Sequence, residues 1–239
     1  MDLDRITHPL RLAKGSHQPG SGKGCAMNAI SYISGDTQIT DFPITSARPL
    51  AAFVQLCNDL LAGTDGYLSP ENSFLALELG WQTVGTAEVP DTVIHAWVAE
   101  LLASPAWGVV QYAENTAAAA IFEIANLHRT LASGDTPSIA AWNSADCAAR
   151  AVSTTLAGAG VYAVRAAYQS TALVDTEHWV TLDAVTGNAL CAHAMATAGT
   201  GADRIVEVTR HAISSWRCLA ELDKPGHIDP ASVDSALDT

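Results

Sequence analysis

Residues 109–132 read VVQYAENTAAAAIFEIANLHRTLA, a long run that contains neither glycine nor proline. Four consecutive alanines, the strongest helix formers, stand at its centre and are followed by bulky apolar residues. These residues predict one long helix, and the flanking sequence extends the same helical character in both directions.

The overall composition favours closely packed helices. Hydrophobic residues make up 49% of the chain, but aromatic residues make up only 6%, and alanine supplies much of the apolar content. Alanine buries little area per residue, so such a core suits helices that approach closely through small faces. We therefore expect an all-α or mostly α protein, an irregular multi-helix bundle with at most one minor β-hairpin.

Capping signals and periodicity place the other helices. Ser69-Pro70-Glu71 combines an N-cap serine, a first-position proline and an acid in the first turn. Apolar residues recur with the helical period over residues 47–62. We expect the six tryptophans to anchor the core. The predicted helices are residues 25–34, 47–62, 70–84, 91–103, 109–132, 138–157, 161–174 and 203–222.

Residues 176–188 allow two interpretations. The run from His178 to Asp183 alternates between polar and apolar residues, and Thr186-Gly187-Asn188 could turn a hairpin. The same residues could form a helix capped by Thr176.

The loop Ser133-Gly134-Asp135-Thr136-Pro137 is the clearest linker. It divides the chain into a helical N-terminal domain, residues 1–132, and an alanine-rich region, residues 138–222, that is predicted to pack on it. Residues 223–239 contain two prolines and a glycine and are predicted to form a flexible tail.

Charge and cysteine content exclude several protein classes. The net charge is −13 with only three lysines, which argues against binding nucleic acid through phosphates. The five cysteines are widely spaced, and the N-terminus lacks a secretory pattern, so reduced thiols in the cytoplasm are expected. No uncharged apolar run reaches about 18 residues, and we expect no membrane partner.

The loop from Gly15 to Asn28, GSHQPGSGKGCAMN, precedes the first predicted helix. Glycine loops at helix N-termini expose amide groups that bind anions. It is not a nucleotide-binding P-loop, because Gly24 stands where that motif requires serine or threonine. The predicted ligand-binding residues are His17, Ser21, Gly22, Lys23, Gly24 and Asn28.

Cys25 is the candidate nucleophile. A thiol at a helix N-terminus near a lysine is expected to have a lowered pKa. His178 could serve as its base and Asp183 could orient that base. Gln18 precedes Cys25 where an oxyanion donor would lie, and the order of glutamine, cysteine and a distant histidine resembles papain-like thiol peptidases. The eight histidines are scattered, and the pair Cys191 and His193 suits no standard zinc motif, so we expect neither a metal nor another cofactor.

Residues 6–86 resemble an uncharacterised group of actinobacteriophage and actinobacterial proteins that begin with a GSGKGCAMN-like motif. The resemblance covers about a third of the chain and implies a helical fold, a cytoplasmic location and no known activity or cofactor; residues 177–188 depart from it. It is carried by ITHPL at 6–10, GSGKGCAMN at 20–28, GD at 35–36, ITD at 39–41 with Pro43, PL at 49–50, ND at 58–59 and TVGT at 83–86.

Three functions remain open at this point. The first is non-enzymatic binding of a protein partner or a small anionic ligand through the loop from Gly15 to Asn28. The second is a cysteine-dependent hydrolase or transferase that uses Cys25. The third is a self-assembling structural protein whose alanine-rich helix faces form homo-oligomers.

Overall fold

The computed structural model describes residues 11–15, 23–174, 178–197 and 203–223. These residues form nine α-helices, and the only β-pairing among them consists of the isolated bridges Ala13–Tyr67 and Ser46–Val84. The all-α prediction is confirmed. The helices are α1 (Ala26–Ile33), α2 (Arg48–Leu61), α3 (Pro70–Gln82), α4 (Asp91–Ala103), α5 (Asn115–Ala132), α6 (Ile139–Ser153), α7 (Gly158–Ser170), α8 (His178–Thr197) and α9 (Asp203–Leu219).

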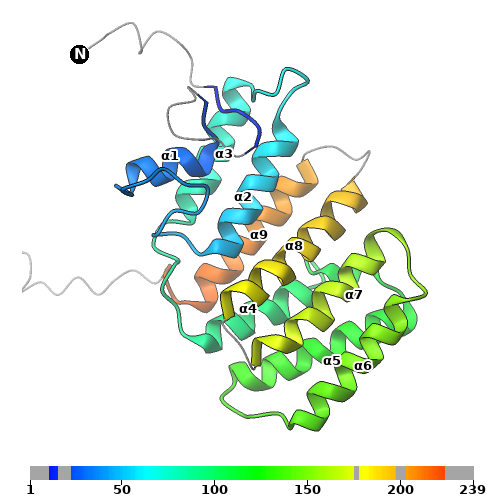
Figure 1. The fold of residues 1–239 in the computed structure, drawn as a ribbon. Helices are drawn as coiled ribbons and strands as arrows, with labels where there is room; N and C mark the ends of the chain where they lie inside the picture. Colours follow the sequence, from blue (N-terminus) through cyan, green and yellow to red (C-terminus); the bar gives the residue numbers. More distant parts are fainter. Residues whose placement is uncertain (1–10, 16–22, 175–177, 198–202, 224–239) are drawn as a thin grey trace, which may run out of the picture.

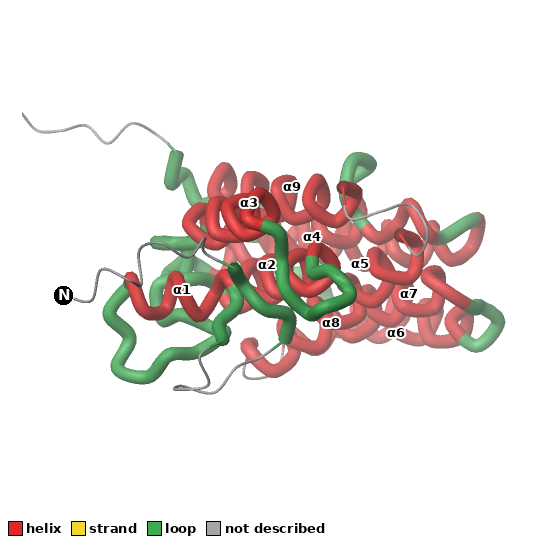
Figure 2. Tube along the Cα trace, turned by 90° about the horizontal axis from the view of Figure 1, so that it is seen from above, coloured by secondary structure: helices red, strands yellow, loops and turns green. Residues whose placement is uncertain are grey.

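The helices form an elongated bundle (Figures 1 and 2). Helices α1 and α3 lie at one end and α5 and α6 at the other, with α4, α7, α8 and α9 between them (Figure 1). Helix α9 comes last in sequence but packs on α2 and α4. The last described helix thus packs against two helices from the N-terminal half of the chain.

The predicted long helix is interrupted. Residues Val109–Tyr112 form a short 3₁₀ helix, and α5 begins only at Asn115. Ala113 and Glu114 between them are extended, and Asn115 has a positive φ of 50°. The Tyr112 hydroxyl lies 2.8 Å from His193 Nδ1 on α8, which holds the 3₁₀ turn against another helix.

The hairpin interpretation of residues 176–188 is wrong, because His178 begins the 20-residue helix α8. Its buried residues recur at helical spacing, and the alternation seen over the first six residues is too short to outweigh that pattern. These buried residues are Leu182, Val185, Thr186, Ala189, Ala192 and His193.

The core is organised around Trp97 on α4. Its ring meets Phe53 of α2 edge-on at 6.2 Å and Trp216 of α9 edge-on at 5.2 Å. Both indole N–H groups donate to backbone carbonyls, Trp97 to Ala212 at 2.9 Å and Trp216 to Thr86 at 3.2 Å. Burying large aromatic surface with every donor satisfied fixes α9 against α2 and α4.

The tryptophans follow the expectation with one exception. Four are buried, but Trp81 on α3 is 56% exposed, so its assignment to the core is wrong. The side chain of Trp179 lies outside the described part of the chain. The buried four are Trp97, Trp107, Trp142 and Trp216.

The predicted domain boundary falls in the turn between α5 and α6, which pack on each other. One cluster of buried hydrophobic residues extends from Leu12 to Trp216, across this turn. Of the predicted tail, only Asp223 lies among the described residues; it accepts a 2.8 Å bond from Arg217 of α9.

Helices α1 and α3 cross closely because Gly80 has no side chain. A Cβ atom at Gly80 would lie 2.9 Å from Ile30 Cγ1 and 3.5 Å from Met27 Sδ, both on α1. This crossing sets the position of α1 and of the loop that precedes it.

Candidate functional site

Cys25 is the N-cap of α1. Its backbone N–H donates to Asn28 Oδ1 at 3.2 Å, and its sulfur accepts from the Asn28 N–H at 3.4 Å. This is a reciprocal capping box in which a thiol and an amide replace the usual hydroxyl and carboxylate. The thiol therefore caps the first turn of α1.

Burial and the neighbouring carboxylate of Asp41 hold the Cys25 thiol in the neutral state. It is fully buried, donates to Asp41 Oδ1 at 3.5 Å and accepts from Gln55 Nε2 at 3.3 Å. Burial raises its pKa to about 11; the Asn28 amide opposes this rise, and the negative charge of Asp41 adds to it. The expectation of a lowered pKa is wrong, because burial and a neighbouring carboxylate outweigh the helix terminus.

The amides at the start of α1 are occupied by side chains of the protein itself. Asn58 of α2 accepts from the Ala26 N–H at 3.2 Å, while Asn28 accepts from the Cys25 N–H. The Asn28 N–H binds the Cys25 sulfur. The expected open recess for an anion is not formed by these three amides, because internal acceptors already satisfy them.

Helix α2 also fixes the two ends of the glycine loop. Asn58, fully buried, donates to the Ala13 carbonyl at 3.0 Å, and Asp59 accepts from the Gly15 N–H at 2.8 Å. The Gly24 carbonyl accepts from the Ala13 N–H at 2.9 Å. These bonds bring residues 13–15 and 24 together beside α2.

The other predicted ligand-binding residues are only partly within the described chain. Lys23 is exposed, and its ammonium lies 5.5 Å from the centre of the Tyr67 ring. His17, Ser21 and Gly22 lie outside the described residues.

Asp183 does not join Cys25. It is exposed on α8 and pairs with Arg48 of α2 at 2.8 Å, whereas the Cys25 sulfur contacts Asp41 and Gln55. His178 is the first residue of α8, and its side chain lies outside the described set. The proposed strand carrying a base and its orienting acid is instead a helix, which removes the geometric basis of the peptidase resemblance.

A second feature of this end of the molecule is apolar and exposed. It consists of five large side chains from α1, α3 and the loop between α1 and α2, and we call it the α1–α3 surface. The residues are Tyr32 (75% exposed), Ile33 (59%), Ile44 (79%), Phe74 (72%) and Trp81 (56%).

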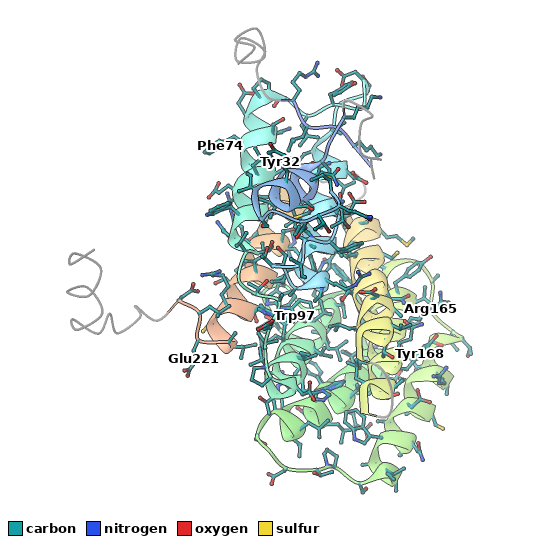
Figure 3. The ribbon with its side chains drawn as sticks, turned by 60° about the vertical axis from the view of Figure 1, so that its left-hand side comes forward. Tyr32, Phe74, Trp97, Arg165, Tyr168 and Glu221 are labelled. Carbon is teal, nitrogen blue, oxygen red and sulfur yellow. The ribbon has the colours of Figure 1, made fainter. Side chains whose placement is uncertain are left out.

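Short contacts join the three segments beneath this surface. Ser34, directly after α1, lies 3.0 Å from the Thr45 hydroxyl. Thr83, at the end of α3, donates to Ser46 Oγ at 2.8 Å. Figure 3 labels Tyr32 and Phe74 at the end of the molecule where α1 packs on α3. The exposed apolar residues therefore come from one connected unit.

Three hollows surround Ile44, with volumes of about 260, 440 and 330 Å³. Phe42 lines the first two, and Ala87 lines the first and the third. Asp36 and Glu88 contribute carboxylates to the second and third hollows, respectively. An exposed isoleucine between concavities is a shape that suits contact with another protein.

The sequence interpretation missed both the α1–α3 surface and the contacts that Gln55 and Asn58 of α2 make with Cys25, Ala26 and Ala13. Gln55 and Asn58 are polar residues within an amphipathic helix, and their inward direction depends on how α1 crosses α2. Phe74 and Trp81 were assigned to a helix, but their seven-residue separation could have indicated a second apolar face opposite Leu79.

Metal and membrane chemistry receive no support from the part of the chain that the structure describes. It contains no group of three or more histidine, cysteine or acidic residues arranged to hold a metal ion. None of its helices combines the length and apolar character required to cross a bilayer.

The chain was compared with protein-family models, with curated proteins and with solved structures. None of the three comparisons gave a match.

Proposed function

We propose that this chain is a non-enzymatic accessory protein that binds a protein partner at the α1–α3 surface. The observation that carries the proposal is the grouping of five large exposed apolar side chains on one connected unit. Contiguous apolar surface is costly in water and marks interaction sites in soluble proteins. Aromatic residues such as Tyr32, Phe74 and Trp81 are also those that dominate binding energy in protein interfaces.

The glycine loop has a supporting role in this proposal. Asn58 and Asp59 hold its ends beside α1, and the capping box of Cys25 and Asn28 rigidifies the helix that carries Tyr32 and Ile33. A preorganised surface loses less conformational entropy on binding. The resemblance of residues 6–86 to actinobacteriophage and actinobacterial proteins supports the further proposal that this binding takes place in the cytoplasm of an actinobacterial or phage-infected cell.

The anionic-ligand and enzyme alternatives are less well supported. The amides of Cys25, Ala26 and Asn28 have internal acceptors, and the pKa of Cys25 is raised rather than lowered. The anionic-ligand alternative required these amides to be free, and the enzyme alternative required a lowered pKa at Cys25.

Site-specific photo-crosslinking tests the proposal. A benzophenone amino acid is placed at Phe74 and, in a matched control, at Phe122, which is 44% exposed on α5 at the far end of the bundle. In an actinobacterial lysate, we expect position 74 to give one discrete adduct that excess unlabelled wild-type chain competes away and Phe74→Ser does not. The same adducts from position 122, or none from position 74, would contradict the proposal.

A further inference from the structure

Helix α3 is apolar on two sides. Ala76 and Leu79 are fully buried against the protein, while Phe74 and Trp81 project from the opposite side. A helix that is apolar all round is normally enclosed by other elements. Here α1, α2 and α9 pack on α3, and the side that bears Phe74 and Trp81 remains exposed.

The exposed side of α3 has the spacing of a helix-packing ridge. Phe74, Glu78 and Trp81 stand at positions i, i+4 and i+7, which places them in one line along two turns, about 10 Å. Another helix laid along this line can place apolar residues of the same spacing between Phe74 and Trp81.

The charges around this line are acidic. Glu71 and Glu78 are exposed on α3 itself, and Glu88 lines one of the hollows beside Ile44. Two arginines of α9 lie near this line. Arg210 reaches Glu78 only at 4.0 Å with both side chains about half exposed, which is a weak surface pair. Arg217 donates to the Gln82 carbonyl at 3.2 Å, and its charge is paired with Asp223 at 2.8 Å. The whole chain carries a net charge of −13. An incoming segment is therefore favoured when it carries positive charge.

We infer that the α1–α3 surface receives a basic amphipathic helix of a partner protein, with apolar residues against Phe74 and Trp81 and lysine or arginine against Glu71, Glu78 and Glu88. This inference rests on the proposed function and specifies its partner. Phe74 and Trp81 are the anchoring contacts, and the carboxylates select the charge of the incoming helix.

A second copy of the chain fits this surface poorly. A two-fold antiparallel pairing of α3 helices sets Phe74 of one copy against Trp81 of the other. Glu78 then lies near Glu78 of the second copy, in a chain that is strongly acidic overall. Like charges opposed in an interface disfavour that pairing.

Two synthetic helical peptides test the inference. Both carry leucine at every third or fourth position; one has lysine at its polar positions and the other has glutamate. We expect the lysine peptide to bind at least about tenfold more tightly in fluorescence anisotropy at low salt, with the difference shrinking as salt rises. Equal binding of the two peptides would overturn the inference.

Four variants, one of them a control, locate the binding. Phe74→Ser and Trp81→Ser are expected to lower the affinity for the lysine peptide by about tenfold or more, whereas Phe122→Ser on α5 leaves this affinity unchanged. Glu78→Lys is expected to lower the affinity for the lysine peptide and to raise the affinity for the glutamate peptide. Circular dichroism melts confirm that each variant is folded, and an equal loss in Phe122→Ser would contradict the assignment.

The inference and the proposed function fail in different ways. If neither peptide binds but the crosslink at position 74 still captures one protein, the partner is not a basic helix and the proposed function stands. If the mass in light scattering doubles with concentration and Phe74→Ser abolishes this, a second copy occupies the surface and the inference is wrong.

Discussion

His95 of α4 and His128 of α5 face each other through their Nδ1 atoms at 3.0 Å, deep between two helices. Ser170 donates to the Ala167 carbonyl at 2.7 Å, so its oxygen accepts from His128 Nε2, 2.9 Å away. His128 Nδ1 is then an acceptor, and His95 supplies the proton between them. The network therefore requires a neutral His128, because a proton on its Nδ1 would set two N–H groups against each other.

This pair predicts that the protein loses stability in acid. Burial and the neighbouring His95 hold the pKa of His128 well below 6.5, and burial lowers that of His193 to about 3. The unfolded chain therefore binds more protons than the native protein below about pH 6.5. From pH 7 to pH 5 we expect His193 to cost about 2 kcal/mol of unfolding free energy and His128 to add to this loss, measured by urea denaturation.

For His128→Gln, the quantity to compare is how steeply the unfolding free energy falls between pH 7 and pH 5, rather than the unfolding free energy at a single pH. That variant is expected to show a shallower loss between pH 7 and pH 5, while His211→Gln, on the exposed side of α9, keeps the wild-type slope. Identical slopes in all three proteins would show that His128 does not contribute.

Cys25 is predicted to react slowly with alkylating reagents. Its pKa of about 11 leaves roughly one thiol in a thousand ionised at pH 8, and its side chain is fully buried. We expect Cys25 and the buried Cys57 to be labelled by iodoacetamide far more slowly than the exposed Cys147, Cys191 and Cys218, as followed by peptide mass spectrometry. Rapid modification of Cys25 would restore the thiol-enzyme hypothesis.

Gly80→Ala is predicted to destabilise the crossing of α1 and α3. The new methyl group would meet Ile30 at 2.9 Å within a closed core, at a cost of about 1–3 kcal/mol in thermal or chemical denaturation. Gly187→Ala in α8 is the matched control, because no atom lies within 4 Å of a Cβ there. That control is expected to be neutral or to gain up to about 1 kcal/mol of helix propensity, and equal effects at both glycines would refute the close crossing.

Asn58→Ala is predicted to cost about 2–6 kcal/mol. The change leaves the buried Ala26 N–H and the Ala13 carbonyl without their partner, and unsatisfied buried groups each carry a penalty of about 1–3 kcal/mol. Asn126→Ala removes a surface amide that binds only Arg129 and serves as the control. A loss no greater than that of the control in chemical denaturation would show that Asn58 does not hold the loop.

Much of the fold was predictable because its signals are local. Ser69 caps α3 as its position before Pro70 and Glu71 indicates, and Gly35 ends the turn after α1 with a positive φ of 78°. The break at Ala113 and Glu114 was missed because it depends on Tyr112 reaching His193, 81 residues later. Local propensity cannot report such a contact.

The candidate site was less predictable for the same reason. Taken locally, a thiol at a helix N-terminus is expected to have a lowered pKa, but burial and the carboxylate of Asp41, from another segment, raise the pKa of Cys25 instead. Trp81 was assigned to the core from its residue type alone. Its exposure follows from Gly80, which turns the neighbouring side of α3 toward α1.

The bond from Trp97 to the Ala212 carbonyl joins residues 115 positions apart. At the usual elongation rate of about 5–20 residues per second, roughly 6–23 seconds separate the synthesis of these two residues. During that interval the nascent polypeptide must carry an incomplete aromatic cluster outside the ribosome. Biogenesis of this protein therefore favours a chaperone, or slow collapse of the first helices, until α9 emerges.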